Sequence, residues 1–124
     1  MASIYVLANA LDSCDALVEL LSRVGHTVRC FTDKLSALAG LGGPRPDLVL
    51  LDAAIPHDAG FDLLTLVRGS PRLSRVPVVM YSQDEDPAVR ARAKTAGADV
   101  YVAKGPGYDH LISRLQPLLD ALPS

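Results

Sequence analysis

Five short apolar runs alternate along the chain with five longer segments in which apolar residues recur at helical spacing. The short runs cover about residues 4–8, 27–31, 47–51, 77–81 and 99–103. The stretches 48–51 and 76–80 are apolar without the alternation of a half-exposed strand, which is typical of parallel strands covered on both faces. The pattern therefore predicts five parallel strands.

The longer segments predict five helices. They are expected at about 13–24, 33–40, from Gly60 onward, from Pro87 to Gly97, and at 108–121. Proline in a first turn and glycine after a last turn are typical helix boundaries. Pro117 lies inside the last helix, so we expect that helix to kink or to end near Gln116.

Strict alternation of strand and helix with short connections predicts an α/β fold, because successive parallel strands are joined by right-handed crossovers. We expect a doubly wound, five-stranded parallel sheet of the flavodoxin-like (βα)5 type with strand order 2-1-3-4-5. The 124 residues fit a single domain, 1–124. In this order the first and third strands are neighbours, and the crevice lies between Asn9 and Asp52.

Composition narrows the classes of function. A net charge of −2, with 49% hydrophobic and 21% charged residues, is typical of a globular protein and gives no field for binding nucleic acid or a membrane surface. No secretory signal or bilayer-spanning run is evident, so we expect a cytoplasmic protein. Cys14 and Cys30 form no Cys-x-x-Cys motif and are expected to be reduced thiols.

Four of the predicted strands end on a polar residue that can take part in chemistry. These residues are Asn9, Asp52, Ser82 and Lys104. Ligands of open parallel sheets bind outside the carboxyl ends of the strands. A carboxylate, an amide, a hydroxyl and an ammonium at one edge predict a site for an anion held beside a carboxylate.

Three segments resemble the receiver domains of response regulators. Residues 47–60 resemble the phosphoacceptor region, in which Asp52 ends the third strand, with Pro56 four residues and Gly60 eight residues later. Residues 77–82 resemble the strand that ends in the family's switch Ser or Thr, here Ser82. Residues 96–104 resemble the final helix–strand step, with its strand aromatic and its lysine.

The resemblance implies a site and its chemistry. Asp52 would be the phosphoacceptor, and Ser82, Lys104 and Tyr101 would be the switch and phosphate-contact residues. A lysine ammonium offsets the charge of an acyl phosphate, and a serine hydroxyl can donate to a phosphoryl oxygen. The family also uses Mg²⁺. No Walker pattern, Gly-x-Gly-x-x-Gly pattern or catalytic triad is present, so we do not expect an enzyme.

Two features depart from the family pattern. The acidic pair that receivers place at the end of the first strand, to hold Mg²⁺, is here Ala8 and Asn9. Because Mg²⁺ is usually bound through carboxylates and phosphate oxygens, Asp52 and Asn9 are expected to bind it weakly, if at all. Asp12 is better explained as a helix N-cap. Gly105 separates Lys104 from the proline that usually follows directly.

These observations favour two-component-type signal transduction by protein–protein contact, through an atypical receiver with weak or no Mg²⁺-dependent phosphorylation. The first alternative is a conventional receiver phosphorylated on Asp52 by a histidine kinase. The second is a small flavodoxin-like ligand-binding protein, although residues 9–13 contain no phosphate-cradling glycine. The partner would be a histidine kinase or a downstream effector.

The resemblance also implies an interaction surface, because receivers commonly signal through the face of helix 4, strand 5 and helix 5. Here that face would include Arg90, Arg92, Tyr101, Leu111 and Leu115, and it could form a homodimer. The alternative is that the leucines pack on the sheet and the arginines form a solvated helix face.

Overall fold

The computed structural model describes residues 2–8, 11–53, 59–82, 86–103, 105 and 107–121, without the side chains of residues 11–13. Its strands are β1 (Ser3–Leu7), β2 (Thr27–Phe31), β3 (Leu48–Asp52), β4 (Val78–Ser82) and β5 (Val100–Ala103). All pair in parallel, in the order β2-β1-β3-β4-β5. The predicted strand order and the pairing of the first strand with the third are confirmed.

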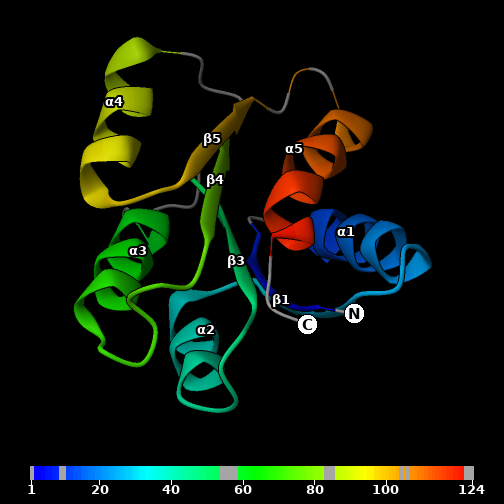
Figure 1. The fold of residues 1–124 in the computed structure, drawn as a ribbon, viewed down its shortest axis with the longest axis horizontal. Helices are drawn as coiled ribbons and strands as arrows, with labels where there is room; N and C mark the ends of the chain where they lie inside the picture. Colours follow the sequence, from blue (N-terminus) through cyan, green and yellow to red (C-terminus); the bar gives the residue numbers. More distant parts are fainter. Residues whose placement is uncertain are drawn as a thin grey trace.

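The helices are α1 (Leu11–Arg23), α2 (Lys34–Leu41), α3 (Ala59–Gly69), α4 (Pro87–Ala96) and α5 (Tyr108–Asp120). Figure 1 shows α1 and α5 on one side of the sheet and α2, α3 and α4 on the other. This arrangement is the doubly wound fold that the alternating pattern predicts.

Each side of the sheet carries its own hydrophobic core. Val6, Leu50 and Val79 pack with residues of α1 and α5, whereas Leu51 and Met80 pack with residues of α2, α3 and α4. Every residue of β3 and β4 is buried. The apolar runs lack alternation because both faces of these strands are covered.

Local side-chain chemistry sets several helix boundaries. The carboxylate of Asp33 caps α2 by accepting a hydrogen bond from the backbone N–H of Ser36 at 2.8 Å. The hydrogen bonds from Ser36 lower the pKa of Asp33. Asp86 caps α4, Pro87 stands in its first turn, and Gly97 ends it in a left-handed conformation with φ of 113°.

Of the two expectations for Pro117, an end of α5 near Gln116 is wrong, and a kink stays a prediction. The helix runs through Pro117 and reaches Asp120. Pro117 lacks the N–H that would bond to the carbonyl of Ser113, but Ser113 lies on the exposed side of the helix, where water can take its place. Leu119 is buried beyond the proline, so core packing favours continuing the helix.

The expectation that two leucines of α5 lie on the interaction surface does not agree with their burial. Leu111 is 3% exposed and Leu115 is fully buried, and both belong to the core beneath α1 and α5. The alternative, that the apolar stripe packs on the sheet, is correct for them because a helix buries the stripe that faces its sheet.

The side chain of Arg68 joins α3 to the segments that directly precede β4 and β5. Its guanidinium donates to the carbonyl oxygens of Gly97 at 2.8 Å and Val76 at 2.7 Å. It also donates to the carboxylate of Asp99 at 2.8 Å, and the same carboxylate accepts the backbone N–H of Val78 at 2.8 Å. Arg68 thereby fixes the entries to β4 and β5.

The expectation of two reduced thiols is wrong as well. Cys14 of α1 and Cys30 of β2 form a disulfide, with their Cα atoms 5.7 Å apart. Packing of α1 against the edge strand brings together two residues that are 16 positions apart in sequence. Cysteine spacing alone does not reveal this contact, because it depends on how helix and strand are rotated against one another.

Candidate functional site

The ends of four strands meet at one edge of the sheet, as the sequence predicts. Leu7 pairs with Leu51, so Ala8 and Asp52 follow side by side on β1 and β3. Asp52 in turn pairs with Tyr81 on β4, and Ser82 pairs with Ala103 on β5. The register therefore brings Asp52 and Ser82 to the same edge, on neighbouring strands.

Asp52 and Ser82 are the polar residues buried at this edge, with 0% and 2% exposure. A buried carboxylate and a buried hydroxyl require polar surroundings, because desolvation disfavours groups that lack hydrogen-bond partners. The arrangement suits a site that receives an anion or a cation from the solvent side of the edge.

Gly60 brings the start of α3 against the backbone of Asp52. A Cβ atom added to Gly60 would lie 2.7 Å from the carbonyl oxygen of Asp52 and 3.4 Å from the terminal methyl of Met80. Only a residue without a side chain fits this approach. The glycine eight residues after Asp52, noted in the sequence, is thus explained by packing beside the site.

Tyr81 is a neighbour of Asp52 that the sequence analysis did not identify as part of the site. It pairs with Asp52 across β3 and β4 and is 1% exposed. Burial raises the pKa of Tyr81 above its usual value, and the charges of Asp52 and Tyr108 act in the same direction. The predicted order of the strands could have revealed Tyr81, because it immediately precedes Ser82 at the end of the strand next to that of Asp52.

Tyr101 lies on β5 in the core beneath α2, α3 and α4, with 3% exposure. The guanidinium of Arg90 on α4 lies 5.1 Å from the centre of the Tyr101 ring. Tyr101, the predicted switch aromatic, is therefore covered by Arg90, which belongs to the predicted interaction surface.

Several residues of the predicted site lie outside the described residues. They are Asn9, Pro56 and Lys104. The ends of β1 and β5, which lead directly into Asn9 and Lys104, are described and lie at the same edge as Asp52.

Among the described residues at this edge, Asp52 supplies a buried carboxylate. Within the described part of the chain, no cluster of three or more His, Cys, Asp or Glu side chains could hold a metal ion. Ala8 contributes only a methyl group at the end of β1, and its side chain is fully buried. Mg²⁺ prefers several oxygen ligands in octahedral geometry, and of the described residues at this edge Asp52 and Ser82 offer side-chain oxygens.

Comparison with known families identifies the domain. The sequence profile of the response regulator receiver domain matches residues 6–116. The chain belongs to the response regulator receiver family. Receiver domains are signalling modules of two-component systems and not enzymes, so the predictions of family and of a non-enzymatic role are confirmed.

Curated relatives of this receiver domain are longer regulatory proteins. The transcriptional regulatory protein KdpE of Mycobacterium tuberculosis is 35% identical over 100 residues, which are 76% of this chain and 42% of the relative. The sensory transduction protein RegX3 of the same species is 30% identical over 119 residues, or 96% and 51%. The chain thus spans about half or less of the length of these relatives.

Solved structures share the fold of this receiver domain. The chemotaxis response regulator CheY4 of Vibrio cholerae superposes with a TM-score of 0.88 at 23% identity, covering 95% of this chain and 98% of that one. The Mn²⁺-bound response regulator Rcp1 gives a TM-score of 0.81 at 22% identity, with both chains fully covered.

The receiver domain shows no membrane-spanning element in its described part. None of the described helices has the length and the apolar character needed to cross a bilayer.

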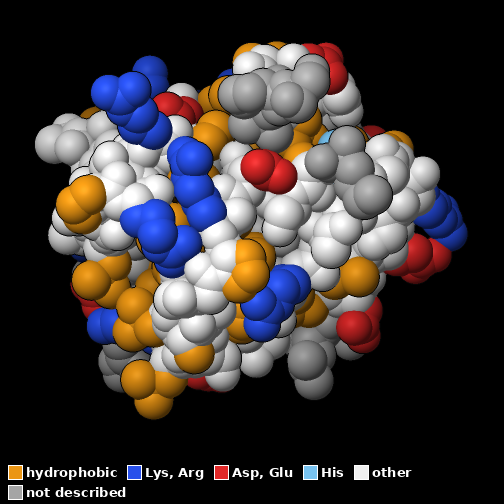
Figure 2. Space-filling model, turned by 60° about the horizontal axis from the view of Figure 1, so that its bottom comes forward, with side chains coloured by type: hydrophobic (Ala, Val, Ile, Leu, Met, Phe, Trp, Pro, Cys, Tyr) orange, Lys and Arg blue, Asp and Glu red, His pale blue; other side chains and the backbone are white. Residues whose placement is uncertain are grey.

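The predicted interaction surface is charged on α4. Arg90, Arg92 and Lys94 are all exposed, and the Arg92 guanidinium lies 3.8 Å from the centre of the Phe61 ring on α3. Figure 2 shows Lys and Arg side chains gathered mainly on the left half of the face, the side on which α3 and α4 lie in Figure 1.

Proposed function

We propose that this chain is an atypical receiver that transmits a signal by protein–protein contact, with weak or no Mg²⁺-dependent phosphorylation. The observation that carries the proposal is the buried methyl group of Ala8 beside Asp52. Ala8 belongs to the same core as Val6 and Leu50, on the side of the sheet that Asp52 also faces by strand alternation. The receiver family places an acidic residue there.

Loss of that carboxylate affects both metal binding and phosphoryl transfer. A carboxylate nucleophile and a phosphoryl donor repel one another, and a divalent cation reduces this repulsion. With Asp52 as the described carboxylate at the edge, the cation would rely on neutral oxygens and water. No step of the proposed function requires Mg²⁺.

The direct test is an NMR titration of the chain with Mg²⁺, followed through the amides of Asp52 and Ala53. We expect small, unsaturated shifts for the native chain and saturating shifts for Asn9→Asp and for Ala8→Asp/Asn9→Asp. The matched control is Asp52→Asn in the double variant, which should abolish the regained binding. Saturation of the native chain, centred on Asp52, would contradict the proposal.

A second measurement addresses the conventional alternative, phosphorylation of Asp52 by a histidine kinase. Acetyl phosphate with Mg²⁺ should give little adduct on the native chain, and any adduct should disappear in Asp52→Asn. Stoichiometric labelling seen by intact mass spectrometry would favour the conventional receiver. Support for that alternative comes from Asp52, Ser82 and Gly60, which are all present at the edge.

The partner in this proposal is a histidine kinase or a downstream effector in the cytoplasm, or a second copy of the chain. The face of α4 and β5 supports this proposal, because Arg90 and Arg92 remain exposed there while covering the rings of Tyr101 and Phe61. Arginine is enriched at protein interfaces.

A further inference from the structure

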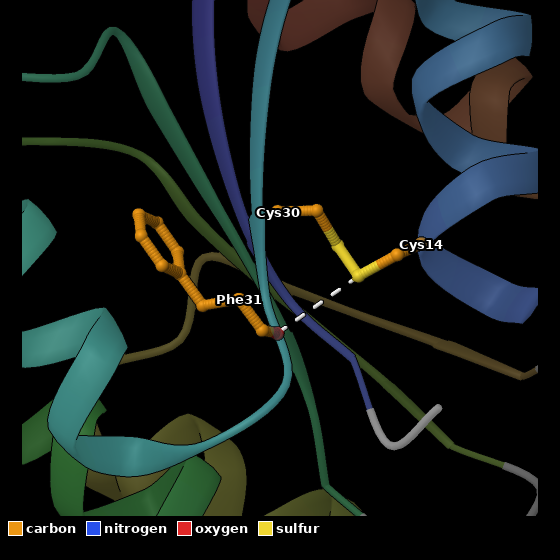
Figure 3. Close-up of a disulfide and its surroundings, with 3 residues drawn as sticks. All are labelled: Cys14, Cys30 and Phe31. Carbon is orange, nitrogen blue, oxygen red and sulfur yellow. Dashed lines mark hydrogen bonds between the residues drawn. A yellow bond between two sulfur atoms is a disulfide. The ribbon is translucent and has the colours of Figure 1, made fainter. Parts of the chain in front are cut away.

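The cysteine pair joins α1 to the edge strand of the sheet. Figure 3 shows Cys30 pointing from β2 towards α1, whereas the ring of Phe31 points to the opposite side. Cys14 is 5% exposed, and Cys30 is partly exposed. Cys14 is therefore the more deeply buried residue of the pair.

The disulfide lies next to a backbone hydrogen bond between the end of β2 and Ala8, which directly follows β1. The carbonyl oxygen of Phe31 accepts the N–H of Ala8 at 2.9 Å. The Sγ atom of Cys14 lies 4.0 Å from this same oxygen, the contact that is dashed in Figure 3. The sulfur can donate a proton to the oxygen only as a thiol, so the oxidation state of Cys14 changes the surroundings of the Ala8 contact.

β2 is a strand that a cross-link can hold in place. It lies at the edge of the sheet, pairs with β1 alone, and none of its residues is fully buried. Edge elements with few buried contacts open locally at low free energy. A covalent bond from Cys30 to α1 opposes that opening.

We propose that Cys14 and Cys30 form a reversible dithiol–disulfide switch that controls how firmly β2 and α1 are held at the end of β1. Disulfides in cytosolic proteins are usually transient and redox-sensing, so a reversible pair fits a cytoplasmic signalling module. The switch goes beyond the proposed receiver function, and it operates whether or not Asp52 is phosphorylated.

The oxidation step uses a small disulfide such as oxidised glutathione as the oxidant. The thiolate of the more accessible Cys30 attacks one sulfur of the oxidant and releases one thiol. Cys14 then loses its proton and attacks the Cys30 sulfur of the mixed disulfide, which releases the second thiol. Two electrons pass from the protein dithiol to the oxidant, and a small dithiol or thioredoxin reverses the step.

The test is a redox titration of the intact chain in mixtures of reduced and oxidised glutathione. The fraction of disulfide is read by mass spectrometry after alkylation of free thiols. Hydrogen exchange is measured in the same samples for Ala8 and for α1. We expect exchange at these amides to be about tenfold faster in the dithiol form, and the melting temperature to be roughly 10 °C lower.

The matched control is Cys14→Ser/Cys30→Ser, whose exchange rates and melting temperature should not respond to glutathione. Cys14→Ser alone should stop at the mixed disulfide on Cys30, because no second thiol can resolve it. If thioredoxin cannot reduce the disulfide in the folded chain, the bond is a permanent cross-link, and the proposal is overturned. Failure of the dithiol form to oxidise, or equal exchange in both forms, would also overturn it.

Discussion

At the scale of single residues, the site depends on how closely the backbone can approach Asp52. The start of α3 contacts the Asp52 carbonyl oxygen through Gly60, where a Cβ atom would stand 2.7 Å away. A backbone oxygen cannot move aside as the end of a flexible side chain can. Gly60 therefore couples the position of α3 to the end of β3.

Replacement of this glycine tests that coupling. Gly60→Ala should lower the free energy of unfolding by roughly 1 to 3 kcal/mol, because the overpacked Cβ displaces either the helix or the strand end. Urea unfolding measures the loss, and the amide shifts of Asp52 and Ala53 report the displacement.

The matched control lies at the other end of the same helix. Gly69 has no atom within 4 Å of an added Cβ, so Gly69→Ala should be neutral or stabilise the fold by about 0.5 to 1 kcal/mol. Equal stability changes in the two variants would show that the close approach at Gly60 has no energetic consequence.

At the scale of elements, the hydrophobic pattern predicted all the strands and helices that the structure describes, and it predicted the strand order. It could do so because burial on both faces leaves uninterrupted apolar runs, and because capping residues such as Pro87 and Gly97 act locally. The edge at which Asp52 and Ser82 meet follows from the same pattern.

What the sequence missed depends on contacts between elements. The Cys14–Cys30 bond requires the rotation of α1 against β2, and the bonds of Arg68 go largely to backbone carbonyls, which no residue pattern reveals. α5 continues past Pro117 instead of ending near Gln116, because core packing of Leu119 outweighs one missing hydrogen bond. Local preference and tertiary packing disagree at such positions, and packing prevails.

The N-terminus of α2 gives a prediction of pH dependence. The hydrogen bonds from Ser36 lower the pKa of Asp33 below its usual 3.8, so the folded protein favours the ionised carboxylate. The stabilisation is fully present above pH 3.8 and is lost as the pH falls through the lowered pKa. The protection of the α2 amides, measured relative to their intrinsic exchange rates, should therefore fall at acidic pH.

The control for this prediction is Asp33→Asn. Asparagine keeps the oxygen that accepts the Ser36 N–H but does not titrate, so α2 in this variant should exchange at a rate that follows only the intrinsic pH dependence. If the native chain and Asp33→Asn respond alike to acid, the cap does not hold the start of α2 through its charge.

At the scale of the whole molecule, the proposed redox switch and the proposed partner surface lie on opposite sides of the sheet. α1, with the cysteine pair, lies on one side, and α4, with its exposed arginines, lies on the other (Figure 1). Asp52 is the last residue of β3 and Ser82 is the last residue of β4, so both lie in the sheet itself, between the two layers of helices. A redox change at β2 and a partner at α4 would therefore act on the same strand edge from opposite directions.

The α4 face leads to a prediction about self-association. Arg90 and Arg92 remain exposed while they cover the buried rings of Tyr101 and Phe61, so a second copy would meet their positively charged guanidinium groups. If this face forms the homodimer, Arg90→Glu/Arg92→Glu should weaken association by about 1 to 3 kcal/mol, or roughly 5- to 150-fold in the dissociation constant. Sedimentation equilibrium over a range of concentrations measures this change.

The control reverses the same number of charges elsewhere. Arg45 and Arg75 are exposed on the loops after α2 and α3, so Arg45→Glu/Arg75→Glu alters the net charge equally without touching α4. Loss of association only in the α4 variant would indicate a specific contact, because a general charge effect falls equally on both variants. A native chain that stays monomeric at every concentration, or equal weakening in both variants, would remove the α4 face as the homodimer interface.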